Sequence, residues 1–398
     1  MSCACGFRLK LKRSNAFFVP ETTIYMDYNA TTPVDKRTLG AFDKICRREW
    51  GNPSSLHSSG IQIGAEIDKC RKNILDYFNL KSGNVYFCSN GSESIHAAIW
   101  GILSKGKTGI PVSTLIEHPA VKKPLRYYRF LKNKTDFLRV DKNGAIILDE
   151  LDRTLKTNGN SFLIYSPVNH ETGAIQPVEE IYKIAKKYDT LILLDSVQAA
   201  PRLPVDKWSK FCDMFSVSGH KIYSPKGIAA LYAKENVKLK PFRLGGCQED
   251  GIFPGTENAP GIAAFNEAIN LLRSEFVEES KFLKILIEEG AKIFDNSKFD
   301  FVIESPENRA PGVLCVSFPW IKDMEKFMYE LNESNICLSR FSACAGRVTG
   351  ASPVLPYMGV PSSRSATSIR ISCGRWSKRE DFYNLAKFIE KYYENLNK

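Results

Sequence analysis

Lys221 is a residue whose type and position could do chemistry. It lies in SVSGHKIYSPKG (216–227), directly after a β-rich run, FCDMFSV (211–217), and Gly219 and Pro225 keep the surrounding chain irregular. Sheets in α/β proteins bind ligands at their strand ends, where a lysine amine could react with an aldehyde. A lysine in a loop is usually only solvated, so this segment taken alone favours a lysine in water.

Other apolar runs also end in polar side chains. The strand expected at 109–116 is followed by His118, and the run LLDSVQAA (193–200) contains Asp195 and Gln198. An acid that follows four apolar residues is expected to be buried, where its carboxyl needs a cationic partner to stay ionised. Asp195 is as well suited to cap a helix, and that alternative stays open at this point.

A phosphate site is suggested by CSNGSES (88–94), in which Gly91 and Ser92 open an expected helix. Free backbone N–H groups at a helix start bind phosphate, and a hydroxyl there can add a hydrogen bond. A serine in this place is more often only an N-cap. Ser218 and His220, beside Lys221, could bind the same phosphate.

Together these side chains match one ligand, pyridoxal phosphate. Lys221 would take its aldehyde, and Asp195 would keep its pyridine nitrogen protonated. Asn169 and Gln198 could bind the ring hydroxyl. The phosphate would be bound by Gly91, Ser92, Ser218 and His220.

The elements that must position these residues follow a βαβα rhythm. Short apolar runs alternate with helical stretches over the first two-thirds of the chain, at 83–89, 109–116, 161–166, 190–195 and 227–233. This rhythm predicts an α/β fold with a mostly parallel sheet covered by helices. Residues 258–291 are predicted to form a long helix, and the strands expected at 312–318 and 369–372 predict a smaller α+β domain.

The composition is that of an ordinary globular protein. The chain has 398 residues, of which 43% are hydrophobic and 25% charged, so it can bury a large core and form two domains. The net charge of +11 suggests an anionic ligand, but the lysines are scattered, which argues against a nucleic-acid partner. No apolar run approaches a membrane span, so no membrane partner is expected.

The cysteines predict a reducing compartment rather than disulfide bonds. There are eleven, without regular spacing. Cys3 and Cys5 form a CxC, but no second pair accompanies it at metal-site spacing, and no metal is predicted.

The N-terminal segment 1–22 is predicted to be an extension. Its first twenty residues contain four basic residues and no acid, which suits an organelle transit segment. Phe7, Leu9 and Leu11 alternate at period two, unlike an amphipathic helix, so a disordered basic tail fits equally well. The expected location is a mitochondrion or a mitochondrion-derived organelle in the first case, and the cytoplasm in the second.

The chain resembles the NifS/IscS-type cysteine desulfurases (group I) of the class V pyridoxal-phosphate-dependent aminotransferases. The resemblance extends from YMDYNATTPVD (25–35) to SIRISCGRW (368–376). Between them, in order, lie GNPSSLHSSG, EHPAV, NHETGAIQPV, LLDSVQAA, SGHKIYSPKG, GTEN and SACAG. This resemblance implies pyridoxal-phosphate fold type I, in a homodimer, with a large cofactor domain at 30–270 and a small domain made of 23–29 and 271–398.

The resemblance also assigns roles to individual residues. Lys221 would hold the cofactor covalently, and His118 would stack on its ring and shuttle protons. Cys344, in SACAG, would be the nucleophile that captures sulfur as a persulfide. The implied cofactor contacts are Gly91, Ser92, His118, Asn169, Asp195, Gln198, Ser218, His220, Lys221 and, across the dimer, Thr256. Asn29 and Arg370 would bind the substrate, and Arg370 would grip its carboxylate.

The implied reaction converts L-cysteine to L-alanine and supplies sulfur for iron–sulfur cluster assembly and tRNA thiolation. The implied partners are an iron–sulfur scaffold protein as sulfur acceptor, with frataxin-like and other accessory proteins. The alternatives are another class V enzyme, such as a selenocysteine lyase or an aminotransferase, and a non-catalytic interaction subunit. Cys344 argues against an aminotransferase, and the intact site residues argue against an inactive subunit.

Several residues depart from the family pattern without removing a cofactor contact or the nucleophile. Ser92 replaces a threonine, His170 the second asparagine of an NNE run, and Cys247 a glycine. Phe253 replaces an arginine, and Arg340 and Phe341 replace a serine and a glycine before Cys344. These departures are expected to affect the rate, the motion of the loop and the docking of partners.

Overall fold

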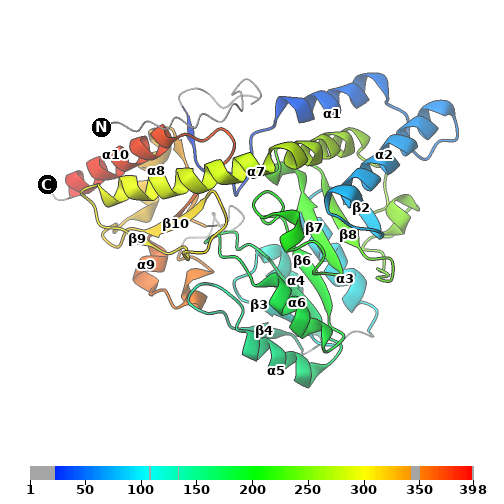
Figure 1. The fold of residues 1–398 in the computed structure, drawn as a ribbon, viewed down its shortest axis with the longest axis horizontal. Helices are drawn as coiled ribbons and strands as arrows, with labels where there is room; N and C mark the ends of the chain where they lie inside the picture. Colours follow the sequence, from blue (N-terminus) through cyan, green and yellow to red (C-terminus); the bar gives the residue numbers. More distant parts are fainter. Residues whose placement is uncertain (1–22, 107–108, 133, 342–349, 397–398) are drawn as a thin grey trace.

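A seven-stranded sheet forms the centre of the larger part of the molecule (Figure 1). The computed structural model describes residues 23–106, 109–132, 134–341 and 350–396. The sheet order is β2-β8-β7-β6-β5-β3-β4, and all pairs are parallel except those that β8 makes with β2 and β7. The strands are β2 (Asn84–Cys88), β3 (Pro111–Thr114), β4 (Asp136–Leu138), β5 (Phe162–Tyr165), β6 (Leu191–Asp195), β7 (Met214–Ser218) and β8 (Ala229–Ala233). The predicted mostly parallel α/β sheet is confirmed.

Helices cover both faces of this sheet, and one hydrophobic cluster lies on each face. The helices are α1 (Lys36–Arg48), α2 (Ser58–Tyr77), α3 (Gly91–Leu103), α4 (Pro119–Lys132), α5 (Leu148–Asn158) and α6 (Val178–Lys186). Helix α6 shows why such segments are helical. Val178, Ile181 and Ala185 fall on one buried face, while acidic residues occupy its first turn and basic residues its last.

Helix α7 (Ala259–Asp295) connects the large sheet to the rest of the chain and crosses the upper half of the molecule in Figure 1, beneath α1. Asn258 caps it by accepting the Gly261 N–H at 3.1 Å. Phe265 packs in a cluster against the large sheet, whereas Leu283 packs in a separate cluster further along the helix. The long helix predicted at 258–291 is therefore present.

The cluster that contains Leu283 lies against a smaller sheet with the order β12-β10-β9. Its antiparallel strands are β9 (Val302–Ile303), β10 (Val313–Ser317) and β12 (Ser368–Ser372). The strand β1 (Ile24–Tyr25) pairs with β11 (Ile336–Cys337), and the helices here are α8 (Met324–Glu333), α9 (Ser362–Ala366) and α10 (Arg379–Leu396). The exact domain limits, 30–270 against 23–29 with 271–398, stay a prediction.

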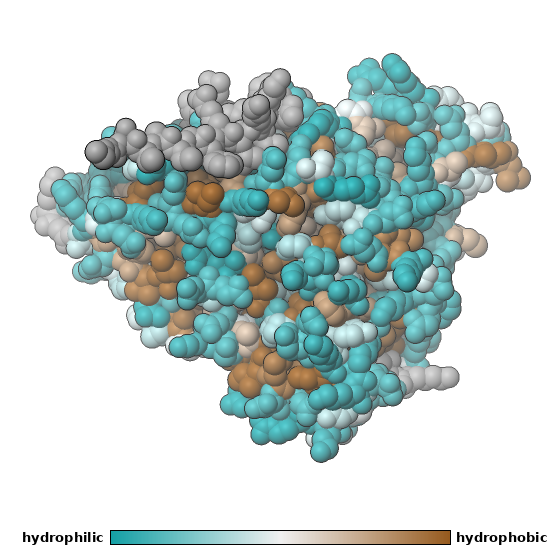
Figure 2. All heavy atoms as spheres, viewed as in Figure 1, coloured by the Kyte–Doolittle hydropathy of each residue, from teal (hydrophilic) through white to brown (hydrophobic). Residues whose placement is uncertain are grey.

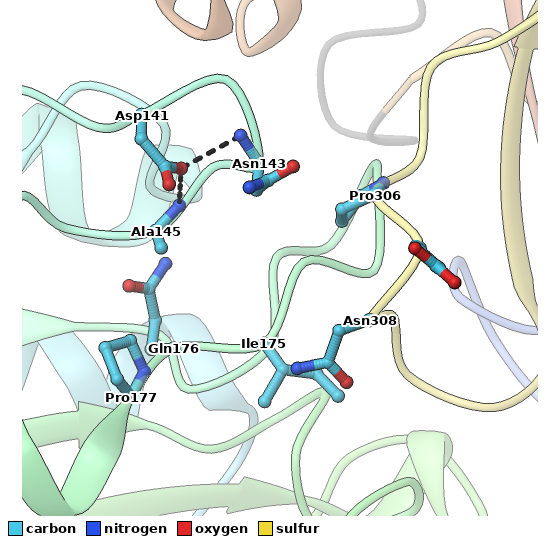
Figure 3. A pocket seen from close by; sticks show the side chains of 9 residues that line it. Asp141, Asn143, Ala145, Ile175, Gln176, Pro177, Pro306 and Asn308 are labelled. Carbon is cyan, nitrogen blue, oxygen red and sulfur yellow. Dashed lines mark hydrogen bonds between the residues drawn. The ribbon is translucent and has the colours of Figure 1, made fainter.

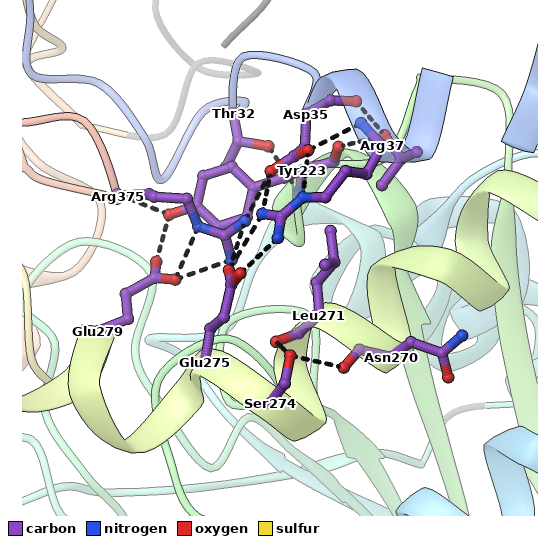
Figure 4. Close-up of polar contacts among 11 residues, drawn as sticks. Thr32, Asp35, Arg37, Tyr223, Asn270, Leu271, Ser274, Glu275, Glu279 and Arg375 are labelled. Atoms are coloured by element: carbon purple, nitrogen blue, oxygen red, sulfur yellow. Dashed lines mark hydrogen bonds and ion pairs between the residues drawn. The ribbon is translucent and has the colours of Figure 1, made fainter. Parts of the chain in front are cut away.

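A buried ion network ties α7 to segments from both ends of the chain (Figure 4). Arg375, whose side chain is 1% exposed, contacts Asp35 at 2.8 Å, Glu275 at 3.1 Å and Glu279 at 3.0 Å. The Arg375 guanidinium also lies 4.2 Å from the centre of the Tyr223 ring. Because Tyr223 is two residues from Lys221, this network also fixes the chain that carries the lysine.

Replacing Arg375 with methionine is expected to lower the free energy of unfolding by about 3–5 kcal/mol, because Asp35 and Glu279 would remain buried without it. The measurement is the urea midpoint of apo-protein, followed by tryptophan fluorescence. Arg379→Met is the matched control. Arg379 is half-exposed and 3.6 Å from Glu289, so its loss should change stability by about 0.5 kcal/mol or less. Equal midpoints for the two variants would contradict the structural role of the network.

Within the described residues, no helix is long and apolar enough to cross a membrane. The same residues contain no group of three histidine, cysteine or acidic side chains that could hold a metal ion. Cys3 and Cys5, with the rest of the N-terminal segment 1–22, lie outside the described residues.

Candidate active site

A cavity of about 140 Å³ lies at the carboxyl ends of the central strands. Asp195 is the last residue of β6, Ser218 is the last residue of β7, and the first turn of α3 faces them. This is the edge of an α/β sheet where ligands bind. Of the predicted site residues, the cavity is lined by Asn29, Gly91, Ser92, His118, Asp195, Gln198, Ser218, His220, Lys221 and Arg370.

Three predicted residues do not line this cavity. Asn169 is buried next to it, and its amide is bonded to the backbone. Thr256 is exposed in the loop before α7. Cys344 lies outside the described residues. The roles predicted for all three stay predictions.

The first turn of α3 offers an anion site. Asn90 caps the helix by accepting the Glu93 N–H at 2.9 Å, and Glu93 accepts the Ser89 N–H at 2.8 Å. The N–H groups of Gly91 and Ser92 precede the intrahelical bonds and can bind a ligand. A Cβ atom at position 91 would lie 2.9 Å from Val197 Cγ2, so the space beside the turn needs glycine.

The other phosphate candidates fit the same end of the cavity. Ser218 Oγ is buried and has no hydrogen-bond partner in the described part of the chain. His220 Nδ1 lies 3.1 Å from Thr31 Oγ1. Burial, with the nearby positive charge of Lys221, lowers the pKa of His220 to about 3, so its ring is neutral at pH 7. A neutral imidazole and an unpaired hydroxyl suit hydrogen bonds to phosphate.

Asp195 fits a cationic ring nitrogen. Its carboxyl is buried at the end of β6, and the burial raises its pKa, with partial compensation from the Val197 N–H at 3.3 Å. A buried carboxyl in this state is stabilised by an adjacent cation. The N-cap alternative does not hold, since Asp195 is followed by turn rather than helix. The donor set therefore fits pyridoxal phosphate at both its phosphate and its ring nitrogen.

Lys221 lies in a short 3₁₀ turn, Gly219–Lys221, directly after β7. Its amine donates hydrogen bonds to the carbonyl oxygens of Asn29 and Ala30, the latter at 2.7 Å. Thr32 holds the turn by donating to the His220 carbonyl through both its N–H, at 2.9 Å, and its hydroxyl, at 3.1 Å. Lys221 thus lines the cavity and is not the solvated loop lysine that its segment alone favoured.

His118 is held as a neutral imidazole. Its Nδ1 accepts the Ala120 N–H at 3.1 Å, which leaves the ring proton on Nε2. Burial, with the neighbouring His170 next in importance, lowers the pKa of His118 to about 3. This ring can stack on a ligand and can donate a proton through Nε2.

The opposite side of the cavity offers a carboxylate site. Arg370 on β12 is 1% exposed, and its guanidinium donates to Asp27 Oδ1 at 2.8 Å and to the His170 carbonyl at 2.9 Å. Its Nε has no partner in the described part of the molecule. Asn29 also donates to the His170 carbonyl, at 3.2 Å. A guanidinium held in this way is suited to bind a carboxylate.

Two residues of this region are not predicted as site residues by the sequence. His170, a departure from the family pattern, lines the cavity. Glu117, directly before His118, is buried and accepts hydrogen bonds from Thr114 at 2.8 Å and from the Ser166 N–H at 2.9 Å. Burial raises the pKa of Glu117 to about 7. Its position at the predicted strand end, before His118, was the available signal.

Arg340 and Phe341, which depart from the family pattern before Cys344, contact each other, and Arg340 also contacts residues that follow Cys344 in the chain. Arg340 donates to the carbonyls of Gly350, at 2.6 Å, and Ala366, at 2.8 Å. Its guanidinium lies 5.0 Å from the centre of the buried Phe341 ring. The segment that carries Cys344 lies outside the described residues, so the expected effect of Arg340 and Phe341 on its motion stays a prediction.

A larger hollow of about 590 Å³ lies on the surface beside Gln176 and Pro306 (Figure 3). One of its two carboxylates is engaged locally, since Asp141 Oδ1 accepts the N–H groups of Asn143 and Ala145, each at 2.9 Å; the other belongs to Glu307. The predicted site residues do not line it. The smaller, buried cavity is therefore the candidate active site.

Comparisons with known proteins show the family to which the chain belongs. The chain matches the family described as aminotransferase class-V over residues 24–385. It is 32% identical over 378 residues to "Cysteine desulfurase IscS" of Dictyoglomus turgidum, which covers 94% of this chain and 95% of that protein. It is also 32% identical over 372 residues to "Cysteine desulfurase, mitochondrial" of Saccharomyces cerevisiae, which covers 92% of this chain and 74% of that protein.

Solved structures with the same fold include a NifS-like protein, with a TM-score of 0.85 and 29% identity over 94% of this chain and 99% of that one. The NifS-like protein from Rickettsia africae ESF-5 gives a TM-score of 0.84 and 28% identity over the same shares. The predicted fold class is confirmed.

Proposed function

The chain belongs to the class-V aminotransferase family and, within it, to the cysteine desulfurases, and from this premise we propose that it converts L-cysteine to L-alanine and captures the sulfur on Cys344. It is a pyridoxal-phosphate-dependent enzyme. One observation carries the proposal. Lys221, Asp195, His118 and Arg370 come from four separate segments and line one buried cavity.

Different residues of the chain would bind the different groups of the cofactor and of the substrate. Asp195 would hold the ring nitrogen, Lys221 the aldehyde carbon, and Arg370 with Asn29 the carboxylate of L-cysteine. The phosphate would be held by Gly91, Ser92, Ser218 and His220. When bound, pyridoxal phosphate supplies an electron sink for the carbanion formed at the substrate Cα.

Two side chains would move protons and one would take the sulfur. The amine of Lys221 takes the proton from the substrate Cα. His118, which is neutral with its proton on Nε2, shuttles protons to the substrate thiol and to the carbanion that leaves as alanine. The thiolate of Cys344 attacks the substrate sulfur. An S–S bond forms, the C–S bond breaks, and its electron pair stays with the carbon that is then protonated.

Purified protein given L-cysteine and a thiol reductant should release sulfide and alanine in equal amounts. Selenocysteine in place of cysteine tests the lyase alternative. A much higher rate with selenocysteine would favour a selenocysteine lyase, and transfer of the amino group to a keto acid would favour an aminotransferase. If cofactor-loaded protein turned over neither amino acid, the remaining alternative would be that the chain is a non-catalytic interaction subunit.

The sulfur is proposed to go to an iron–sulfur scaffold protein, with frataxin-like and other accessory proteins as further partners, and to tRNA thiolation. The relative from Saccharomyces cerevisiae that is named mitochondrial supports a mitochondrion or a mitochondrion-derived organelle as the location. The cytoplasm is the location if segment 1–22 is not a transit segment.

The active unit is proposed to be a homodimer. Trp50 is 78%, Leu56 93% and Ile61 61% exposed, and apolar side chains exposed together mark interaction sites. Figure 2 shows apolar side chains at the end of the molecule that carries α1 and α2. Thr256 is exposed and does not line its own cavity, which suits a residue that reaches the partner's phosphate.

Mixing two inactive variants, Lys221→Ala and Thr256→Glu, is expected to restore about one quarter of wild-type activity. Random pairing makes half of the dimers mixed, and each mixed dimer has one intact site out of two. The measurement is sulfide release after the subunits have been exchanged. Lys221→Ala mixed with the double variant is the control, because every site then lacks the lysine. If light scattering showed a monomer and that monomer were fully active, the proposed homodimer would be contradicted.

A further inference from the structure

A buried arginine, Arg202, lies behind the carboxylate site. It belongs to the turns after β6, is 5% exposed and does not line the cavity. Its guanidinium donates to Asn29 Oδ1 at 2.6 Å, to the Pro311 carbonyl at 2.5 Å and to the Cys373 carbonyl at 3.5 Å. These acceptors come from three distant segments, so Arg202 joins the start of the chain to the segments beside β10 and β12.

The fold leaves room for this guanidinium at Gly312. The φ of Gly312 is +78°, in the left-handed region that favours glycine. A Cβ atom there would lie 2.6 Å from Arg202 Nη1 and 2.9 Å from the Cys373 carbonyl oxygen. The guanidinium of Arg202 therefore passes close to a backbone that only glycine suits.

The hydrogen bonds of Arg202 do not neutralise its charge. All three acceptors are neutral oxygen atoms, and within the described part of the chain no acidic side chain forms an ion pair with it. Arg370, by contrast, has Asp27 at 2.8 Å. A buried charge without an acidic partner is costly, and an anion bound nearby reduces that cost.

The contact with Arg202 fixes which way the Asn29 amide faces. An arginine has only donors, so it needs the amide oxygen, whereas the His170 carbonyl, 3.2 Å away, needs the amide nitrogen. Both contacts therefore select the same orientation. Asn29 lines the cavity, and its amide nitrogen keeps a second N–H that can bind the carboxylate of a substrate.

The backbone of Asn29 is held independently of Arg202. Its N–H donates to Ser372 Oγ at 2.9 Å, and its carbonyl accepts hydrogen bonds from Gln198, at 3.0 Å, and from the Lys221 amine. Loss of Arg202 should therefore release the Asn29 side chain and leave the carbonyl that holds Lys221 in place.

We propose that Arg202 is a positioning residue that holds Asn29 as a hydrogen-bond donor to the carboxylate of the amino acid substrate. This proposal rests on the proposed function, because the carboxylate is that of its substrate. The charge of Arg202 polarises the Asn29 amide, which strengthens the hydrogen bond that the amide donates in turn. Without Arg202 the amide is free to present its oxygen, which repels a carboxylate.

The test compares two ligands that differ by the carboxylate. Holoenzyme is titrated to equilibrium with L-alanine, the product of the proposed reaction, and with ethylamine, which is alanine without its carboxylate. Binding is followed by the absorbance of the cofactor, and neither ligand contains sulfur to transfer. The measured quantity is the carboxylate preference, defined as the dissociation constant of ethylamine divided by that of L-alanine.

Arg202→Met, which keeps a similar volume without a charge, should lower the carboxylate preference about tenfold, as expected for one hydrogen bond to a charged group. A purely structural role would weaken both ligands equally and leave the preference unchanged. Arg202→Lys is the conservative variant, and most of the preference should remain because its ammonium can still donate to Asn29 Oδ1. Arg202→Gln keeps only a neutral donor and should lower the preference about threefold, which tests the proposal if the methionine variant fails to fold.

Arg364→Met is the matched control. Arg364 pairs with Glu304 at 3.1 Å and does not line the cavity, so this variant should keep the wild-type preference. Asn29→Leu tests the route of the effect. In that background Arg202→Met should lower the preference no further, because the amide through which it acts is gone.

An unchanged preference in Arg202→Met would overturn the assignment of Arg202 and leave the proposed function intact. An equal loss with and without the Asn29 amide would also overturn it, because Arg202 would then act on the carboxylate without Asn29. If wild-type holoenzyme bound L-alanine no more tightly than ethylamine, the proposed function would fail together with the assignment.

Discussion

Replacing Lys221 with alanine is expected to abolish the covalent attachment of the cofactor and to lower turnover by about four orders of magnitude. The amine lines the cavity and is held by the Asn29 and Ala30 carbonyls, where it can meet both the aldehyde and the substrate Cα. Its loss removes the group that takes the Cα proton, and one general base contributes up to about 10⁴-fold. The phosphate and ring-nitrogen contacts would remain, so the variant should still bind the cofactor reversibly.

The measurement is mass spectrometry of the chain after borohydride reduction, together with sulfide release. Lys226→Ala is the matched control, because Lys226 is an exposed lysine of the same loop. It should keep both the reduced adduct and the activity. A reduced adduct that persists in Lys221→Ala would move the covalent bond to another lysine.

Replacing Cys344 with serine is expected to leave cofactor binding unchanged and to eliminate the persulfide. A hydroxyl is far less nucleophilic than a thiolate and cannot carry a transferable sulfur. After exposure to L-cysteine, the wild-type chain should gain one sulfur on the peptide that contains Cys344. The serine variant should gain none, and its sulfide release should fall to background.

Other cysteines provide the controls for this result. Burial raises the pKa of Cys337, and that of Cys373 to about 12, so neither is a ready thiolate at pH 7. Cys247 is exposed and is the most accessible rival of the three. Cys247→Ser should keep full activity and the persulfide on Cys344. Sulfur found mainly on Cys247, Cys337 or Cys373 would identify a different nucleophile.

Local sequence patterns determined most of the central sheet and half of the site. Strands β5 and β6 are short apolar runs, and the end of such a run is visible in the sequence, so the sequence alone places Asp195 and Lys221 at strand ends. The three-residue strand β4 was missed, because an element that short shows no periodicity. Gly91 and Ser92 were recognisable because a helix start is also a local feature.

The rest of the site depends on contacts between distant segments. The carbonyls that hold the Lys221 amine belong to Asn29 and Ala30, about 190 positions earlier in the chain, and Arg370 reaches the same cavity from a different sheet. Packing alone brings these segments together, and no local pattern encodes it.

Asn169 and His170 show most clearly what the sequence alone cannot decide, namely which of two adjacent polar residues lines the cavity. Both are polar residues at the same strand end, and the sequence by itself predicted a cofactor contact for Asn169 and only a departure from the family pattern for His170. The tertiary structure decided which of them faces the cavity. The Ile116 carbonyl, more than fifty positions away, accepts a hydrogen bond from the Asn169 amide, whereas His170 lines the cavity.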